Sequence, residues 1–160
     1  MIRRAHILLA MGLVAAAPES PAIAQFRRPP PASAPVLSGI DGLRAEFRVL
    51  SGTDTVFFGG NSAALGIPAK TILLAQAAWL RRHPEILVSI EGHADSSDTR
   101  DHALAVGARR AQEVRDFLIL FGVPPAQLSA TSWGKERVAV AGTSESAFAA
   151  NRRVQTVLVR

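Results

Sequence analysis

The 160-residue sequence contains no cysteine and no tyrosine. Without cysteine the chain has no disulfide, no thiol nucleophile, no thiolate metal ligand and no residue for an N-terminal lipid anchor. Catalytic signatures are also missing, because there is no Gly-x-Ser-x-Gly elbow and the glycines of residues 59–66 lack the lysine and hydroxyl of a phosphate loop. These absences argue against a hydrolase or a thiol enzyme.

Positive charge is in excess but is not concentrated. The chain has 18 lysines and arginines against 13 acidic residues, a formal net charge of +5 and a sequence pI near 11.2. The cations are scattered and form no dense basic stripe, so we do not expect nucleic acid as a partner. The hydrophobic fraction of 48% is enough for one ordinary core, and the length fits one domain with terminal extensions.

The first 24 residues have the three parts of a secretory signal peptide in order. Arg3 and Arg4 precede a short apolar run at 7–17, and Ala22-Ile23-Ala24 is a cleavage signature. The run is shorter than the ~20 residues that span a bilayer, so we expect export with no retained transmembrane segment; an uncleaved anchor is the alternative. Prolines make residues 25–42 a semi-rigid linker, which leaves residues 43–160 as the domain.

Hydrophobic periodicity divides the domain into alternating strands and helices. The longest helix is predicted over 101–121, because Gly107, Ala111, Val114 and Leu118 recur at helical spacing and Gly122 stops the pattern. The pattern also predicts helices at 67–82 and 144–150, and strands at 53–58, 86–90, 128–133 and 154–159.

This order predicts an α/β domain built as a two-layer α+β fold. Strands joined by a helix tend to be parallel neighbours, and a final antiparallel strand makes a mixed four-stranded sheet with the helices packed on one face.

An acidic and a basic side chain lie at the two ends of one strand–loop–helix unit. Asp95 follows the second predicted strand, and Arg110 comes fifteen positions later on the long helix. A carboxylate and a guanidinium so placed suit a small zwitterion, with its ammonium on Asp95 and its carboxylate on Arg110. An internal Asp95–Arg110 salt bridge is the alternative reading.

Several motifs in the same order resemble the OmpA-like domain. They are Glu91-Gly92-His93-Ala94-Asp95, Gly107-Ala108-Arg109-Arg110-Ala111, Gly122-Val123-Pro124, Trp133-Gly134-Lys135-Glu136 and Asn151-Arg152-Arg153-Val154. The resemblance covers roughly residues 50–160. It implies non-catalytic binding of peptidoglycan through the diaminopimelate of the stem peptide, in the periplasm at or near the outer membrane. It assigns the ammonium to Asp95 and the carboxylate to Arg110.

The resemblance adds three further candidate site residues. They are His93 in the glycine-histidine segment, Asn61 at a position where the family usually has aspartate, and one arginine of Asn151-Arg152-Arg153. Side chains alternate along a strand, so only one of the two arginines can face the site, and Arg153 is our choice.

The chain departs from the family at Gly60-Asn61, at His102-Ala103 and at Ala108. These departures leave fewer polar side chains to support the two charged groups. The alternative function is therefore an envelope protein-interaction module with weakened or lost wall binding. His93, Asp95 and His102 do not have the spacing of a metal site. We therefore expect no cofactor, no metal and no catalysis; peptidoglycan is the expected partner, with other envelope proteins as further candidates.

Overall fold

The computed structural model describes residues 39–159. The predicted signal peptide and nearly all of the predicted linker lie outside the described residues. The elements in chain order are α1 (Ile40–Ser51), β1 (Thr55–Phe57), α2 (Ile67–Leu80), β2 (Val88–His93), α3 (Arg100–Leu120), the short 3-10 helix η2 (Pro125–Gln127), β3 (Leu128–Gly134), α4 (Glu145–Asn151) and β4 (Arg153–Leu158). Every strand and helix predicted from the sequence is present, with ends that differ by a few residues.

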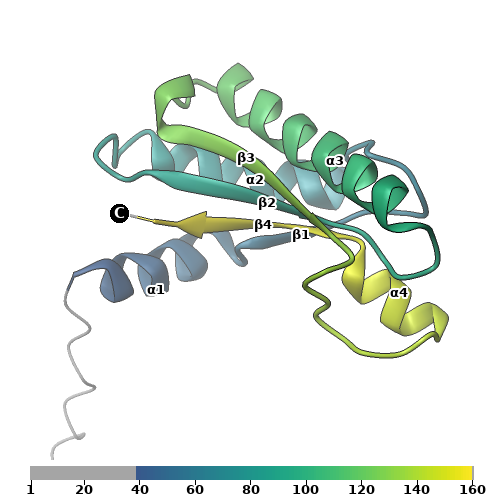
Figure 1. Ribbon diagram of the computed structural model, residues 1–160. Helices are drawn as coiled ribbons and strands as arrows, with labels where there is room; N and C mark the ends of the chain where they lie inside the picture. The colour runs from purple at the N-terminus through teal and green to yellow at the C-terminus, as the bar shows by residue number, and fades with distance from the viewer. Residues whose placement is uncertain (1–38, 160) are drawn as a thin grey trace, which may run out of the picture. The chain divides into compact units, whose positions relative to one another are not determined.

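The four strands form one mixed sheet in the order β1-β4-β2-β3 (Figure 1). β2 and β3 are parallel neighbours, as predicted for strands joined by a helix. β1 and β2 are not neighbours, because β4 lies between them and pairs antiparallel with both. Val154 is therefore opposite Val56 on one side and Gly92 on the other. The expected mixed sheet is confirmed, but the insertion of the last strand separates the first two.

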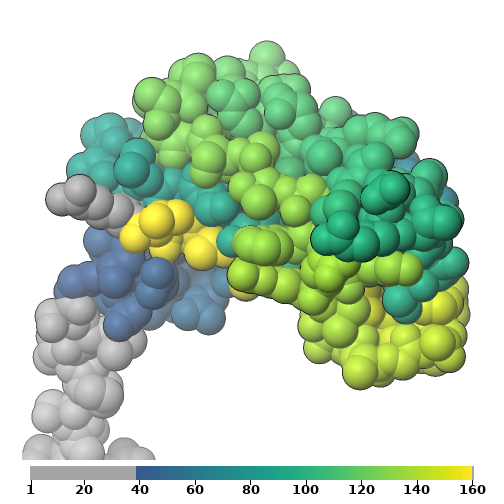
Figure 2. All heavy atoms as spheres, viewed as in Figure 1, coloured from purple at the N-terminus to yellow at the C-terminus, as the bar shows by residue number. Residues whose placement is uncertain are grey.

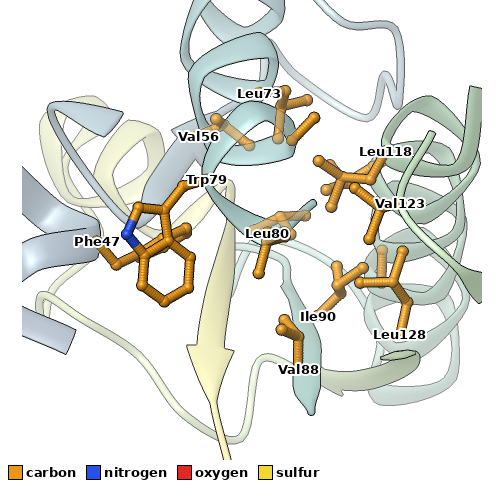
Figure 3. Close-up of a cluster of buried hydrophobic side chains, with 14 of the residues drawn as sticks. Phe47, Val56, Leu73, Trp79, Leu80, Val88, Ile90, Leu118, Val123 and Leu128 are labelled. Carbon is orange, nitrogen blue, oxygen red and sulfur yellow. The ribbon is translucent and has the colours of Figure 1, made fainter. Parts of the chain in front are cut away.

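One face of the sheet is buried under helices and the other is open. Along β4 the buried residues Val154, Thr156 and Leu158 alternate with half-buried ones, as expected for a strand with one covered face. α3 packs across β2 and β3, and α2 lies beside α3 (Figure 1). The helices supply Leu73, Leu80 and Leu118 to the core, where they meet the strand residues Val56, Val88 and Ile90 (Figure 3).

Helix α1 was not predicted from the sequence, and it begins at Ile40, before the predicted domain start at residue 43. It joins the core through Phe47, whose ring meets Trp79 of α2 edge-to-face with the centroids 5.1 Å apart. The Trp79 indole N–H donates to the Glu46 carboxylate at 3.1 Å. A buried Phe and a satisfied indole thus attach α1 to the domain.

The open face of the sheet borders a hollow in the molecular surface (Figure 2). In Figure 2, α1 stands on one side of this hollow and the yellow-green segment that joins β3 to α4 stands on the other. Among residues 39–159, no helix is both long enough and apolar enough to cross a bilayer.

Candidate functional site

The candidate site lies where β2, α3 and the segment after β1 meet. Gly92 of β2 and Gly107 of α3 bring strand and helix into backbone contact. A Cβ atom built on Gly92 would overlap the carbonyl oxygen of Gly107, and one on Gly107 would overlap the hydroxyl of Ser132. Because neither glycine has a side chain, α3 can lie close to the sheet. Arg110, one turn further along α3, can then reach the end of β2.

Arg110 is the most completely buried charged residue of the site, with 0% of its surface exposed. Its Nε donates to the Ser62 carbonyl at 2.9 Å, one Nη donates to the His93 carbonyl at 2.9 Å, and the other Nη donates to the Gly60 carbonyl. The guanidinium also lies over the Phe58 ring, 5.4 Å from its centroid. Three carbonyl groups and an aromatic face thus hold the buried cation in one orientation.

Burial lowers the pKa of Arg110 to about 10, with the charge of Asp95 acting in the opposite direction and that of Arg152 adding to the decrease. The guanidinium therefore remains protonated at neutral pH.

Asp95 follows β2 and is only 5% exposed. One carboxylate oxygen accepts hydrogen bonds from both the backbone N–H and the hydroxyl of Ser97. The other lies 3.2 Å from an Nη of Arg152. Burial acts to raise the pKa of Asp95, but the hydrogen bonds from Ser97 and Arg152 outweigh it and hold the pKa below its ordinary value. Asp95 is an ionised and well-oriented carboxylate.

No salt bridge joins Asp95 to Arg110 within residues 39–159. Asp95 pairs with Arg152, and Arg152 in turn pairs with the exposed Glu145 at the start of α4. The two predicted groups still act on each other, since the Asp95 charge raises the pKa of Arg110. The internal salt bridge considered from the sequence is therefore not formed, and the two charges have separate protein partners.

Asn61 lies at the exposed rim of the site. Its amide nitrogen is 3.4 Å from the Asp98 carboxylate and 3.4 Å from the His102 ring. Its neighbours Gly60 and Ser62 provide two of the carbonyls that bind Arg110. The structure thus brings Asn61 and Arg110 together through one short segment.

Of the two arginines, Arg152 contacts Asp95, whereas we chose Arg153 from the sequence. Arg153 is the first residue of β4, and its guanidinium turns toward the open face, where it donates to the Arg137 carbonyl at 3.2 Å. Arg152 precedes the strand and points to the opposite side. Alternation along the strand indicated that only one arginine could face Asp95, but the register of β4 was needed to show which one.

His93 does not present its ring to this site. The side chain is 2% exposed, and only its backbone carbonyl takes part, as an acceptor from Arg110. Burial and the charge of Arg153 lower the pKa of the imidazole to about 4, so the ring is neutral at physiological pH. The part of the chain that the structure describes holds no cluster of three or more histidine or acidic residues suited to a metal ion.

Asn151 has a structural role in this region. Its side-chain oxygen accepts from the N–H groups of Ala139 and Val140, at 2.7 and 3.1 Å, and its amide donates to the Val140 carbonyl at 2.8 Å. These bonds tie α4 to the segment that follows β3, and they fix the position of the adjoining Arg152.

Comparison with known proteins matches residues 57–152 to the model of the OmpA family. A peptidoglycan-associated lipoprotein from Agrobacterium fabrum is 40% identical over 121 residues, which cover 76% of this chain and 68% of that protein. The protein of the same name from Pseudomonas aeruginosa is 38% identical over 116 residues, covering 72% of this chain and 68% of its own length.

Two solved structures share the fold. The peptidoglycan-associated lipoprotein from Burkholderia pseudomallei superimposes with a TM-score of 0.65 and 34% identity, over 67% of this chain and 91% of that one. The C-terminal domain of Helicobacter pylori MotB gives a TM-score of 0.64, over 68% of this chain and 86% of that one. Its identity of 24% shows a common fold alone.

Proposed function

The chain belongs to the OmpA family, and from this membership we propose that it binds peptidoglycan through the diaminopimelate of the stem peptide. The protein is a non-catalytic wall-binding module of the cell envelope, located in the periplasm in association with the outer membrane. The observation that carries the proposal is the pair of ionised groups at the end of β2: the buried Arg110 guanidinium and the Asp95 carboxylate, each held by its own protein contacts.

Asp95 is suited to an ammonium group. Its low pKa keeps it charged at any physiological pH, and a positive ligand can share the oxygen that Arg152 contacts at 3.2 Å. Because Arg152 is also bound to Glu145, it keeps a partner if the ligand displaces it from Asp95. The exchange of one cation for another leaves no buried charge unpaired.

Arg110 is suited to a carboxylate but is covered in this conformation. Its three bonds to carbonyl groups leave some guanidinium N–H groups for a ligand. The carbonyls of Gly60 and Ser62 belong to an exposed segment, so a shift of this segment uncovers the guanidinium. Asn61, which lies between them, offers an amide to the ligand at the rim.

The second candidate function is an envelope protein-interaction module with weakened or lost wall binding. The observation that favours it is the occupation of both groups by protein partners: Arg110 by three carbonyls and Asp95 by Ser97 and Arg152. A ligand must compete with these contacts.

Co-sedimentation with purified sacculi tests the proposal. We expect the wild-type chain to pellet with diaminopimelate-containing sacculi, and we expect Asp95→Asn and Arg110→Lys to reduce pelleting at least about tenfold, as for the loss of a hydrogen bond between charged groups. Arg109→Gln is the matched control, because Arg109 neighbours Arg110 but is exposed.

Sacculi that carry lysine in place of diaminopimelate provide a ligand control, since they keep the ammonium but lack the carboxylate assigned to Arg110. A wild-type chain that never pellets with either wall supports the interaction module. Equal pelleting of the wild type and both site variants contradicts the assignment of Asp95 and Arg110.

A further inference from the structure

Buried polar atoms without a protein partner gather at one end of the open face. Six such side-chain atoms occur among residues 39–159, and four of them belong to His93, Trp133 and Arg153. We name these three residues the donor cluster. A buried polar group without a partner is costly, and such groups are rare in folded proteins, so several at one place indicate a binding site.

The sheet register places the donor cluster on three neighbouring strands. Gly92 of β2 pairs with Val154 of β4, so continuing the antiparallel register sets His93 beside Arg153. On the other side of β2, the register with β3 shifts between Gly92 and His93. Trp133 is the extra residue at this bulge, because Ser132 pairs with Gly92 and Gly134 with His93. The three side chains thus occupy one row across the sheet.

The unpartnered atoms of the cluster are mostly hydrogen-bond donors. They include the indole N–H of Trp133 and an Nη of Arg153, neither of which can accept. A neutral imidazole adds one further N–H. The complementary ligand is therefore rich in acceptors.

Electrostatics favours an acceptor that is negative. Arg153 contributes one positive charge to the cluster, and a second comes from Arg137, whose guanidinium lies 3.4 Å from the centroid of the Trp133 ring. The acids nearby already have partners: Asp95 and Glu145 pair with Arg152, and Glu91 lies 4.0 Å from Arg137.

Access depends on Arg137. Its backbone carbonyl accepts from Arg153 at 3.2 Å, whereas its side chain is 56% exposed and rests on the indole ring. Rotation of this side chain toward solvent uncovers Trp133 without any change in the sheet.

We propose that the donor cluster binds a small oxyanion, which accepts hydrogen bonds from Trp133 and Arg153 once Arg137 has turned away. The site is distinct from that of the proposed function, because Asp95 attracts a cation and the donor cluster attracts an anion. Arg152 stays outside it, with its Nη groups on Asp95 and Glu145.

NMR titration of the two tryptophan indole N–H groups tests the proposal on the whole chain. The probes are sodium acetate, sodium phosphate and N-acetyl-alanyl-alanine, each compared with sodium chloride at equal ionic strength. We expect a saturable shift of the Trp133 resonance with an oxyanion and not with chloride. Trp79 is the internal control and should not move, because its N–H is already bonded to Glu46.

Arg153→Gln should weaken the binding of the oxyanion at least about tenfold. Arg109→Gln, at an exposed position, should leave the affinity for the oxyanion unchanged. Tighter binding of the dipeptide than of acetate assigns the site to a peptide-borne carboxylate, and the reverse assigns it to a free oxyanion. An unmoved Trp133 resonance in the wild type, or an equal effect of chloride, overturns the proposal even if the variant does not fold. Sacculus pelleting of the same sample reports separately on the Asp95 site.

Discussion

The carboxylate of Asp95 lies 3.2 Å from the guanidinium of Arg152, while Arg110 on α3 turns to backbone carbonyls. Asp95 is therefore kept ionised by its own loop and by the residue before β4. The orientation of the Asp95 carboxylate is fixed by hydrogen bonds from Ser97 to one oxygen and from Arg152 to the other.

We predict that Ser97→Ala and Arg152→Gln both raise the pKa of Asp95. Ser97→Ala loses the hydroxyl bond, and Arg152→Gln loses the guanidinium bond and its positive charge, each of which lowers this pKa. Carbon-detected NMR titration of the Asp95 carboxyl measures both shifts. Ser96→Ala, at an exposed neighbour in the same loop, is the control. A pKa that stays at the wild-type value in either variant would contradict the role given to that residue.

The close approach of Gly92 and Gly107 leads to a prediction about stability and binding together. Gly92→Ala should lower the free energy of unfolding by about 3 kcal/mol, because the new methyl group overlaps the Gly107 carbonyl and helix and strand must separate. The displaced helix carries Arg110, so sacculus pelleting should fall even where the domain stays folded. Urea unfolding and pelleting of the same sample give the two readouts.

Gly59→Ala is the matched control for this prediction. Gly59 has no atom within 4 Å of the position of a Cβ and no positive φ, so stability should change by less than about 0.5 kcal/mol. Equal stability of Gly92→Ala and Gly59→Ala would show that α3 adjusts to the extra methyl group without cost.

The sequence was sufficient for the fold class, but not for all neighbours in the sheet. Local periodicity revealed α2, α3 and their strands, since each has an apolar stripe that repeats along the chain. It could not show that β4 inserts between β1 and β2, because strand order depends on pairing between distant segments. α1 was overlooked although Ile40, Leu43 and Phe47 recur at helical spacing. Its contact with Trp79, made across the fold, shows that this stripe belongs to the core.

The same limit applies to the site. Asp95 and Arg110 were selected from their spacing and family motifs, and the structure places both at the end of β2. Their partners were not foreseeable, since the carbonyls of Gly60 and Ser62 lie about fifty positions before Arg110. The signal for Arg152 was present in Asn151-Arg152-Arg153, but choosing between the arginines required the register of β4.

We predict that Arg110→Lys destabilises the domain by roughly 2–4 kcal/mol. A lysine ammonium is a single point donor and cannot reach three carbonyls that lie around a planar guanidinium. It also loses the contact with Phe58. Thermal unfolding checks this, with Arg109→Lys as the exposed control. A melting temperature within a degree of the wild type for Arg110→Lys would show that Arg110 is held for the ligand and contributes nothing to stability.

The buried imidazole of His93 predicts how stability depends on pH. Its folded pKa of about 4 lies below the ordinary value of 6.5, so the folded state resists protonation that the unfolded chain accepts. The stabilisation is fully present above pH 6.5 and is lost as the pH falls from 6.5 toward 4, by roughly 3 kcal/mol in total. Asp95, whose pKa is also lowered, adds its own loss at more acidic pH.

His93→Gln separates these two contributions, because glutamine does not titrate. The free energy of unfolding of the variant, measured in urea at pH 7.0 and pH 5.0, should differ less than that of the wild type, although the variant is less stable at both. His102→Gln, at a half-buried position at the start of α3, should retain the pH dependence of the wild type. An unchanged dependence in His93→Gln would mean that the imidazole gains a proton in the folded state as readily as in the unfolded chain, with the Arg137 backbone, which acts to raise the His93 pKa, offsetting burial.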